Sequence, residues 1–266
     1  MKATRLAALL GIASVALLAA CPAPESKPPR GGRSNKTKDA REPEDPRTYQ
    51  RLGDSASANK QWPEAIDSYQ KYLAIDPGNS VVHNSIGLAN LVLGRADEAE
   101  THFRRAVEIN PQFADALNNL GLVLDRKGDR AGAKTQFAAC AAITTNITPW
   151  TCLYNLGKLQ FEDGEYPQAV ESFRQAFERR PEVTTGLGLG MALEKQGRLR
   201  EACAQFEKCV KAFAADCTPQ YYLGKCLYDQ KRYQEAGTPF EKVVELCPGT
   251  ETAGKANEYL KVLREH

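Results

Sequence analysis

The residues that could carry chemistry in this chain are its eight cysteines and three histidines. A cysteine thiolate can attack an acyl carbon, bind a metal ion or form a disulfide, and a histidine commonly serves it as general base. His83 and His102 lie far in the sequence from every cysteine, and no Cys-x-x-Cys pair occurs. This spacing suggests neither a catalytic triad nor a metal site. We therefore expect a protein that is not an enzyme and needs no cofactor.

A glycine-rich segment offers a second possible chemistry, the binding of phosphate. Gly186, Gly188 and Gly190 alternate with leucines, as in some phosphate-binding loops. No predicted strand precedes the segment, and it falls inside a predicted helix, so it lacks the context that phosphate binding needs. We expect instead a thin helix that packs closely on its neighbours or leaves room for a ligand.

One cysteine has a chemistry that its neighbours suggest. A basic start precedes the apolar residues 6–18, which have the length and small-residue content of a signal peptide rather than of a membrane span. The stretch ends in Leu-Ala-Ala-Cys at residues 18–21, which resembles the bacterial lipobox, where the cysteine thiol takes a diacylglycerol before cleavage. We expect residues 1–20 to be a lipoprotein signal peptide and Cys21 to carry the lipid. The alternative is an ordinary secretory peptide cut near Ala20.

The residues after Cys21 predict where the lipid would hold the chain. In enteric bacteria Asp after the lipidated cysteine favours the inner membrane, whereas Pro22 follows here, which favours the outer membrane facing the periplasm. Several acyl chains such as palmitate make a durable anchor. Residues 22–45 hold five prolines and no aliphatic residue larger than alanine, so we expect residues 21–45 to form a lipidated, disordered tether.

The composition is that of a folded soluble protein with no strong net charge. Hydrophobic residues make up 42% of the chain, which suffices for an ordinary core. Thirty-five basic residues nearly cancel thirty-three acidic ones, so no net field draws the chain to nucleic acid. We expect no nucleic-acid partner.

From Pro46 onward a repeat of about 34 residues dominates the sequence. Each unit has a glycine at position 8, an alanine at position 20 and an aromatic residue at position 24, and most have a proline near position 32. This is the spacing of the tetratricopeptide repeat (TPR), a pair of antiparallel helices. The sequence predicts an all-α solenoid over residues 46–250. Its six units are 46–79, 80–113, 114–147, 150–182, 183–216 and 217–250.

Two departures from the period carry information of their own. The third unit lacks its proline, and the inserted residues Thr148 and Pro149 reset the register before the fourth unit. After the sixth unit, residues 251–266 form one more amphipathic helix, with Ala256, Tyr259 and Leu260 on a single face. We expect this helix to cap the open core of the last repeat.

Without Cys21, seven cysteines remain for disulfides in a compartment outside the cytoplasm. The second helix of one repeat should pack antiparallel on the first helix of the next. When two residues face each other across this contact, the position numbers that they have within their own repeats should therefore add up to a nearly constant value. This rule leaves Cys247 without a partner and makes at least one thiol free. The predicted pairs are Cys140–Cys152, Cys203–Cys226 and Cys209–Cys217.

The first helices of TPR units line a concave groove, and positions 2, 5, 6, 9, 12 and 13 point into it. Some of these positions carry apolar residues that the core does not require, so we expect them to form an exposed apolar patch. Such a patch usually marks a surface that binds a partner. Farther along, Tyr221, Tyr222, Lys225 and Tyr228 add aromatic anchors with positive charge. The candidate groove residues are Val81, Asn84, Leu88, Leu91, Val92, Asn118, Asn119, Leu122, Tyr154, Asn155, Lys158 and Phe161.

The asparagines among these residues recur at the spacing of the repeat. Asn84 and Asn118 occupy position 5 of their units, and Asn119 and Asn155 occupy position 6. Amides in such a row could hold the backbone of an extended peptide. The alternative is that asparagine is simply frequent in this part of the TPR pattern.

A lipobox, a short tether and six TPR units together resemble the type IV pilus pilotins, the PilF, PilW and Tgl group of outer-membrane lipoproteins that promote secretin assembly. The Asn-Asn-Leu-Gly of residues 118–121 and the Leu-Gly of 156–157 fit this likeness, whereas the cysteine-rich second half departs from it. The resemblance implies a monomer whose amino-terminal groove binds an outer-membrane secretin. The alternatives are a TPR scaffold for β-barrel assembly or peptidoglycan synthesis, and a periplasmic adaptor without a fixed partner.

Overall fold

The computed structural model describes residues 45–265 of the chain. This part contains thirteen α-helices and no strand. The signal peptide, the lipidated cysteine and most of the tether predicted above lie outside the described residues. The helices are α2 (Pro46–Ala58), α3 (Trp62–Ile75), α4 (Ser80–Val92), α5 (Ala96–Ile109), α6 (Ala114–Arg126), α7 (Arg130–Ala142), α8 (Pro149–Glu162), α9 (Tyr166–Arg179), α10 (Val183–Lys195), α11 (Leu199–Ala212), α12 (Cys217–Asp229), α13 (Tyr233–Leu246) and α14 (Glu251–Leu263).

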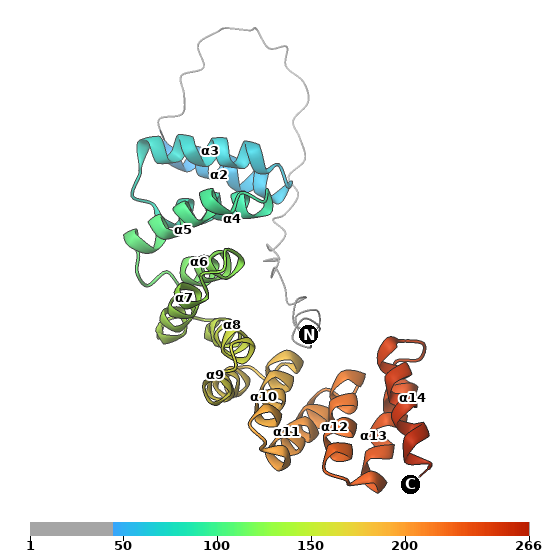
Figure 1. The fold of residues 1–266 in the computed structure, drawn as a ribbon. Helices are drawn as coiled ribbons and strands as arrows, with labels where there is room; N and C mark the ends of the chain where they lie inside the picture. Colours follow the sequence, from blue (N-terminus) through green and yellow to red (C-terminus); the bar gives the residue numbers. More distant parts are fainter. Residues whose placement is uncertain (1–44, 266) are drawn as a thin grey trace, which may run out of the picture. The chain divides into compact units, whose positions relative to one another are not determined.

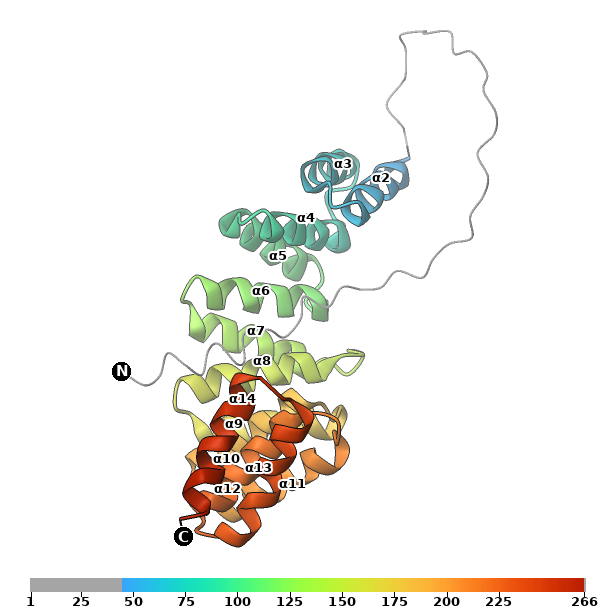
Figure 2. The same cartoon turned by 90° about the vertical axis from the view of Figure 1, so that its right-hand side faces the viewer.

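The helices follow one another in chain order, and each packs on the next (Figure 1). Twelve of them form six antiparallel pairs, and α14 packs on α13 and touches α12. Figure 2 shows the same succession of pairs from the side. The all-α repeat fold that the 34-residue spacing predicts is therefore confirmed. No helix in the described part has both the length and the apolar content needed to cross a bilayer.

The turn inside each pair requires a left-handed backbone at repeat position 15. Four of the six turns place glycine there with φ between 76° and 86°, the conformation that glycine adopts without steric cost. In the first and last pairs Lys60 and Lys231 hold the same position at φ 60° and 62°. The glycines in question are Gly94, Gly128, Gly164 and Gly197.

Each pair is held by an aromatic ring that lies on the glycine at position 8. In the third pair, for example, a Cβ added to Gly121 would lie 2.6 Å from Cε1 of Phe137. The alanine at position 20, here Ala133, is fully buried beside this contact. Glycine and alanine thus let the two helices approach closely while the ring fills the space between them. The six rings, none more than 2% exposed, are Tyr69, Phe103, Phe137, Phe173, Phe206 and Phe240.

The last helix covers the end of the sixth pair. Ala253 and Ala256 of α14 are buried, and Tyr259 stacks on Phe240 with ring centroids 4.6 Å apart and an interplanar angle of 6°. Thr250 caps the helix by accepting a hydrogen bond from the backbone N–H of Ala253. The face of α13 that a seventh pair would occupy is therefore covered by α14.

Candidate functional site

The predicted groove residues belong to α4, α6 and α8, the first helices of their pairs. Helix α4 contacts α6, and α8 contacts α10, so first helices adjoin one another along the stack. Asn119 Nδ2 donates to Asn84 Oδ1 at 3.0 Å, and Asn155 Nδ2 donates to Asn118 Oδ1 at 2.9 Å. These amides thus form hydrogen bonds between repeats. Asn84 is only 7% exposed, so the expectation that it faces a ligand is wrong, whereas Asn118, Asn119 and Asn155 are partly exposed and keep hydrogen-bonding capacity.

Apolar side chains stand exposed beside these amides on α4. Val81, Leu88 and Val92 are 49%, 40% and 55% exposed, and their spacing of seven and four residues puts them on one helical face. Leu91 and Leu122 are only half-buried while packing against the core. We call Val81, Leu88 and Val92 the α4 stripe. These exposed aliphatic side chains lie on the same first helix as Asn84, one of the bonded amides.

Two predicted anchors of α8 do not present surface to a partner. Tyr154 and Phe161 are each only 6% exposed, so the expectation that they anchor a ligand is wrong. Tyr154 packs on Phe173 with ring centroids 5.9 Å apart, and Phe161 packs on Tyr166. Burial and the charge of Glu162 raise the pKa of Tyr154 to about 12, and its hydroxyl has no hydrogen-bond partner in the described part.

Helix α10, which follows this pair, is more deeply buried than any other helix of the described part. Every residue from Thr185 to Leu193 is buried, so the helix is enclosed all round. Its glycines allow this, because a Cβ on Gly188 would meet the Phe173 ring at 2.8 Å and one on Gly186 would meet Phe177 and Cys209. The glycine-rich segment therefore serves helix packing and not phosphate binding. The open apolar surface lies at the amino-terminal repeats.

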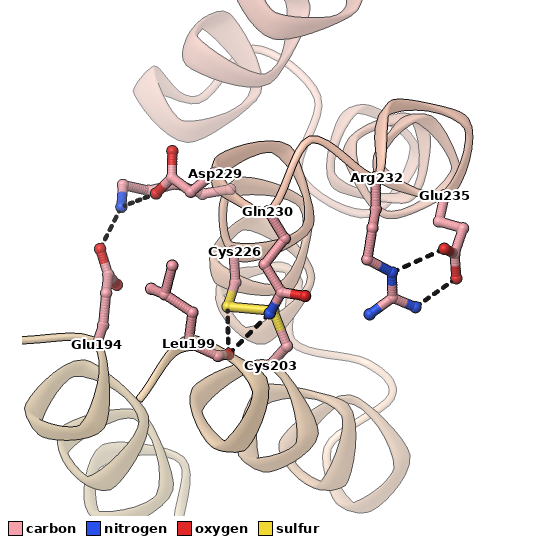
Figure 3. Close-up of a disulfide and its surroundings, with 9 residues drawn as sticks. Glu194, Leu199, Cys203, Cys226, Asp229, Gln230, Arg232 and Glu235 are labelled. Carbon is pink, nitrogen blue, oxygen red and sulfur yellow. Dashed lines mark hydrogen bonds and ion pairs between the residues drawn. A yellow bond between two sulfur atoms is a disulfide. The ribbon is translucent and has the colours of Figure 1, made fainter. Parts of the chain in front are cut away.

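Lys158 and Lys225 occupy the same repeat position on different first helices. Lys158 lies 3.8 Å from Glu162 within α8. Lys225 on α12 binds Glu194 of α10 at 2.5 Å and Asp229 at 3.0 Å; Figure 3 shows both carboxylates directed at one amine. Burial alone would lower the pKa of Lys225, but these hydrogen bonds raise it above its ordinary value. Both cations thus serve ion pairs inside the chain.

The tyrosines of α12 form an aromatic cluster with the last helix. Tyr221 and Tyr228 both contact Tyr259 edge-on, and Tyr222 stacks on Phe206. All three tyrosines of α12 are partly exposed. The sequence pattern identified the α12 tyrosines and placed Tyr259 on the capping face, but it did not predict their contact, because this contact joins α12 to a helix outside the repeat period. The cluster attaches α14 to the sixth pair.

Three disulfides lie in the described part of the chain. The structure joins Cys140 to Cys152 across α7 and α8, with Cα atoms 6.0 Å apart. It joins Cys203 to Cys226 across α11 and α12, with Cα atoms 5.6 Å apart (Figure 3). Both are pairs that the packing of adjacent repeats predicts. The second lies beside Gln230, whose amide donates to Leu199 O at 2.9 Å.

The third predicted pair, Cys209–Cys217, is wrong. Cys217 is instead bonded to Cys247, with Cα atoms 6.2 Å apart, and Cys209 is a buried free thiol. The two helices within a repeat are also antiparallel, which brings the start of α12 beside the end of α13. The prediction considered only contacts between repeats and so missed this one. Burial raises the pKa of Cys209 to about 11, which makes it an unreactive core side chain.

The two histidines of the second repeat face each other. Nδ1 of His83 lies 3.1 Å from Nδ1 of His102, and Nε2 of His83 lies 3.3 Å from the carbonyl oxygen of Pro77. Burial lowers the pKa of both imidazoles. No group of three or more metal-ligating side chains gathers anywhere in residues 45–265. The histidine pair therefore belongs to the packing between α4 and α5.

Family models of tetratricopeptide repeats match most of the folded part. The matches cover residues 47–79, 91–128, 113–147, 154–216 and 187–250. Among curated relatives, the photosystem I assembly protein Ycf3 of Rippkaea orientalis is 31% identical over 86 residues, which are 31% of this chain and 50% of that protein. The chain thus spans about half the length of this relative.

Solved structures with similar folds cover most of this chain at low identity. The C-terminal part of a TPR protein from Cytophaga hutchinsonii aligns with a TM-score of 0.69 at 20% identity, covering 81% of this chain and 87% of that one. Pseudomonas aeruginosa PilF (TM-score 0.63, 17% identity) covers 80% and 96%. PilW, a type IV pilus biogenesis factor, aligns at 0.63 and 20% identity and covers 80% and 98%. With its family matches and its six helix pairs, the chain belongs to the tetratricopeptide repeat family.

Proposed function

We propose that this chain is a non-enzymatic scaffold that binds a segment of another protein along the α4 stripe. The observation that carries the proposal is the exposure of three aliphatic side chains on one face of a first helix. Exposing these side chains to water does not stabilise an isolated chain. A partner that covers them contributes roughly 25 cal/mol of binding free energy for each Å² of apolar surface buried.

The amides next to the stripe determine what kind of segment fits. In each bonded pair one carboxamide N–H of Asn119 or Asn155 is used inside the chain, and its second N–H and its carbonyl oxygen remain available. These groups can hold the backbone of a bound segment while the stripe receives its apolar side chains. The fitting partner is therefore a peptide segment with exposed aliphatic or aromatic residues.

Substitution on the stripe tests the proposal directly. The double variant Leu88→Asp and Val92→Asp should abolish capture of the partner while leaving the helical circular dichroism signal intact, because both side chains are exposed on α4. Ile75→Asp is the matched control, because Ile75 is 48% exposed on α3, away from the stripe, and should bind normally. Partner binding that survives the double substitution would show that another surface is used.

The finer proposal is that the chain is a pilotin, which holds a secretin at the outer membrane while its multimer forms. The likeness in fold to PilF and PilW and the lipobox ending at Cys21 support it. Deletion of the gene should remove heat-resistant secretin multimers. Unchanged multimers would reject the pilotin role, and a general loss of outer-membrane barrels would point to a scaffold of β-barrel assembly.

The anchor that this role requires rests on Cys21. Cells fed with labelled palmitate should label the wild-type chain, and the label should fractionate with the outer membrane. Cys21→Ser should lose the label and release the chain to the soluble periplasmic fraction. A labelled Cys21→Ser chain, or a wild-type chain found in the inner membrane, would contradict the proposed location.

A further inference from the structure

Helix α14 has the fewest buried residues of any helix in residues 45–265. Only Ala253 and Ala256 of its thirteen residues are buried, whereas every other helix there buries at least three. Gly254 lies between them, and a Cβ added to it would meet nothing within 4 Å, so this glycine weakens the helix without serving a close contact. A helix with so few buried apolar contacts is among the first parts of a fold to open locally.

The start of α14 is held by a short series of contacts that begins at a disulfide. Cys247 is the C-cap residue of α13 and is bonded to Cys217, the first residue of α12. The carbonyl oxygen of Cys247 accepts hydrogen bonds from Oγ1 of Thr250 at 2.8 Å and from its backbone N–H at 3.3 Å. Oγ1 of Thr250 in turn accepts from the backbone N–H of Ala253 and so caps α14. The disulfide therefore fixes the point from which α14 begins.

The same disulfide is the easiest of the three described ones for a thiol to reach. Cys247 is partly exposed, and Cys217 is 7% exposed. The four cysteines of the other two disulfides are each 1% exposed. Because exchange requires the attacking thiolate to approach a sulfur atom closely, access favours reduction of the more exposed disulfide first. Cys247 carries the sulfur that a reductant in solution meets.

We propose that Cys217–Cys247 is a redox switch that a dithiol reductant opens, and that its opening releases α14 from the sixth pair. A thiolate of the reductant attacks Sγ of Cys247, forms a mixed disulfide with it and displaces the Cys217 thiolate. The second thiol of the reductant loses its proton, attacks the mixed disulfide and displaces the Cys247 thiolate. Each displaced thiolate takes up a proton. Two electrons thus pass to the two cysteines, and the reductant leaves as a disulfide.

Release of α14 uncovers the aromatic rings on which it packs. Tyr259 leaves its stack on Phe240, and Tyr221 and Tyr228 lose their edge-on contacts with Tyr259. The oxidised chain has a closed end at its last repeat, and the reduced chain has an open one. Because the repeats of a solenoid depend mainly on their neighbours, the α4 stripe is the same in both states. The switch is therefore independent of the function proposed above.

Stepwise reduction of the purified full chain with dithiothreitol tests the switch. At each concentration one aliquot is alkylated and another exchanges amide hydrogen, and mass spectrometry of peptic peptides reads both. Cys217 and Cys247 should become alkylated at a concentration at least tenfold below that needed for the other two disulfides. Over the same range exchange in α14 should rise at least tenfold, while α2 to α5 stay within twofold. Cys209, a buried free thiol, should stay unalkylated because the chain remains folded.

Variants without the disulfide separate its role from other effects of the reductant. The double variant Cys217→Ser and Cys247→Ser should exchange α14 as fast as the reduced wild type, with no reductant present. Cys140→Ser with Cys152→Ser is the matched control, because it removes the disulfide between α7 and α8, and its α14 should exchange within twofold of the oxidised wild type.

Several results would overturn the proposal. One is an α14 that stays protected after Cys217 and Cys247 are alkylated in the wild type. Another is reduction of a buried disulfide first, and a third is a control variant that opens α14 equally. Alkylation of Cys209 over the same range would show general loosening of the fold in place of a switch.

Discussion

Gly121 illustrates how one missing Cβ sets the distance between two helices. A methyl group added there would lie 2.6 Å from the Phe137 ring, whereas one added to Gly237 of α13 would meet nothing within 4 Å. We expect Gly121→Ala to lower the free energy of unfolding by about 1–3 kcal/mol through overpacking. Gly237→Ala should raise it by roughly 0.5–1 kcal/mol, because alanine is the better helix former. Urea titrations followed by circular dichroism measure both, and shifts in the same direction would contradict the packing described.

The histidine pair predicts how stability changes with pH. Burial lowers the pKa of His83 and His102 below the ordinary value of 6.5 in the folded chain. The unfolded chain therefore takes up protons first, so the stability from neutral imidazoles is complete above pH 6.5 and is lost as the pH falls through the folded pKa values.

A fall in pH should consequently lower the stability of the wild type more than the stability of a chain in which one histidine of the pair is replaced. The urea midpoint of the wild type should fall between pH 7.5 and pH 5. Acidic residues such as Glu100, whose pKa is lowered by hydrogen bonds from Lys127 and Arg104, contribute to that fall in both chains. His102→Gln should show a smaller decrease, because it removes one of the two imidazoles whose pKa is lowered by burial, and in His102 also by the charge of His83. Parallel pH profiles for the two chains would contradict a role for the pair.

Pairs of helices are the elements that the disulfides stabilise. Cys203–Cys226 joins α11 to α12 across 23 residues of sequence, and a loop of that size predicts about 3 kcal/mol from the restricted unfolded chain. The double variant Cys203→Ser and Cys226→Ser should lose about that much stability in urea. Cys209→Ala is the control, since this thiol is free and alanine fills the same repeat position in α5 and α9; it should change stability by about 1 kcal/mol or less. Equal effects of the two changes would show that the crosslink contributes nothing.

At the scale of the whole molecule, stability should follow the order of the repeats. Each helix packs on its neighbours in sequence. Loosening one repeat should therefore destabilise the adjacent repeats, and the effect should decrease with distance along the stack. The three disulfides of the described residues lie between residues 140 and 247. Dithiothreitol should therefore speed amide hydrogen exchange in α8 to α14 and leave α2 to α5 unchanged. Mass spectrometry of peptic peptides can follow every helix at once, and a uniform change along the chain would contradict solenoid behaviour.

Several features of the fold follow from the sequence alone because they are local and repeated. A helix pair needs a small residue where its axes approach, an aromatic residue to fill the gap and a turn between, and these recur in register from Tyr49 to Phe240. The pairs Cys140–Cys152 and Cys203–Cys226 could be predicted for the same reason, since the period fixes which faces of adjacent repeats meet. Periodicity thus determined the fold class, the number of repeats and part of the crosslinking.

What the tertiary structure decided is which side chains the solvent reaches. Tyr154 and Leu88 both stand at predicted groove positions, yet one is 6% exposed and the other 40%. The ring of Tyr154 packs on Phe173 of α9, the second helix of its own pair. Cys217 is bonded to Cys247 because the two helices inside a repeat are antiparallel, which brings these residues together. Burial is a property of all neighbours together, so a period read along one chain cannot supply it.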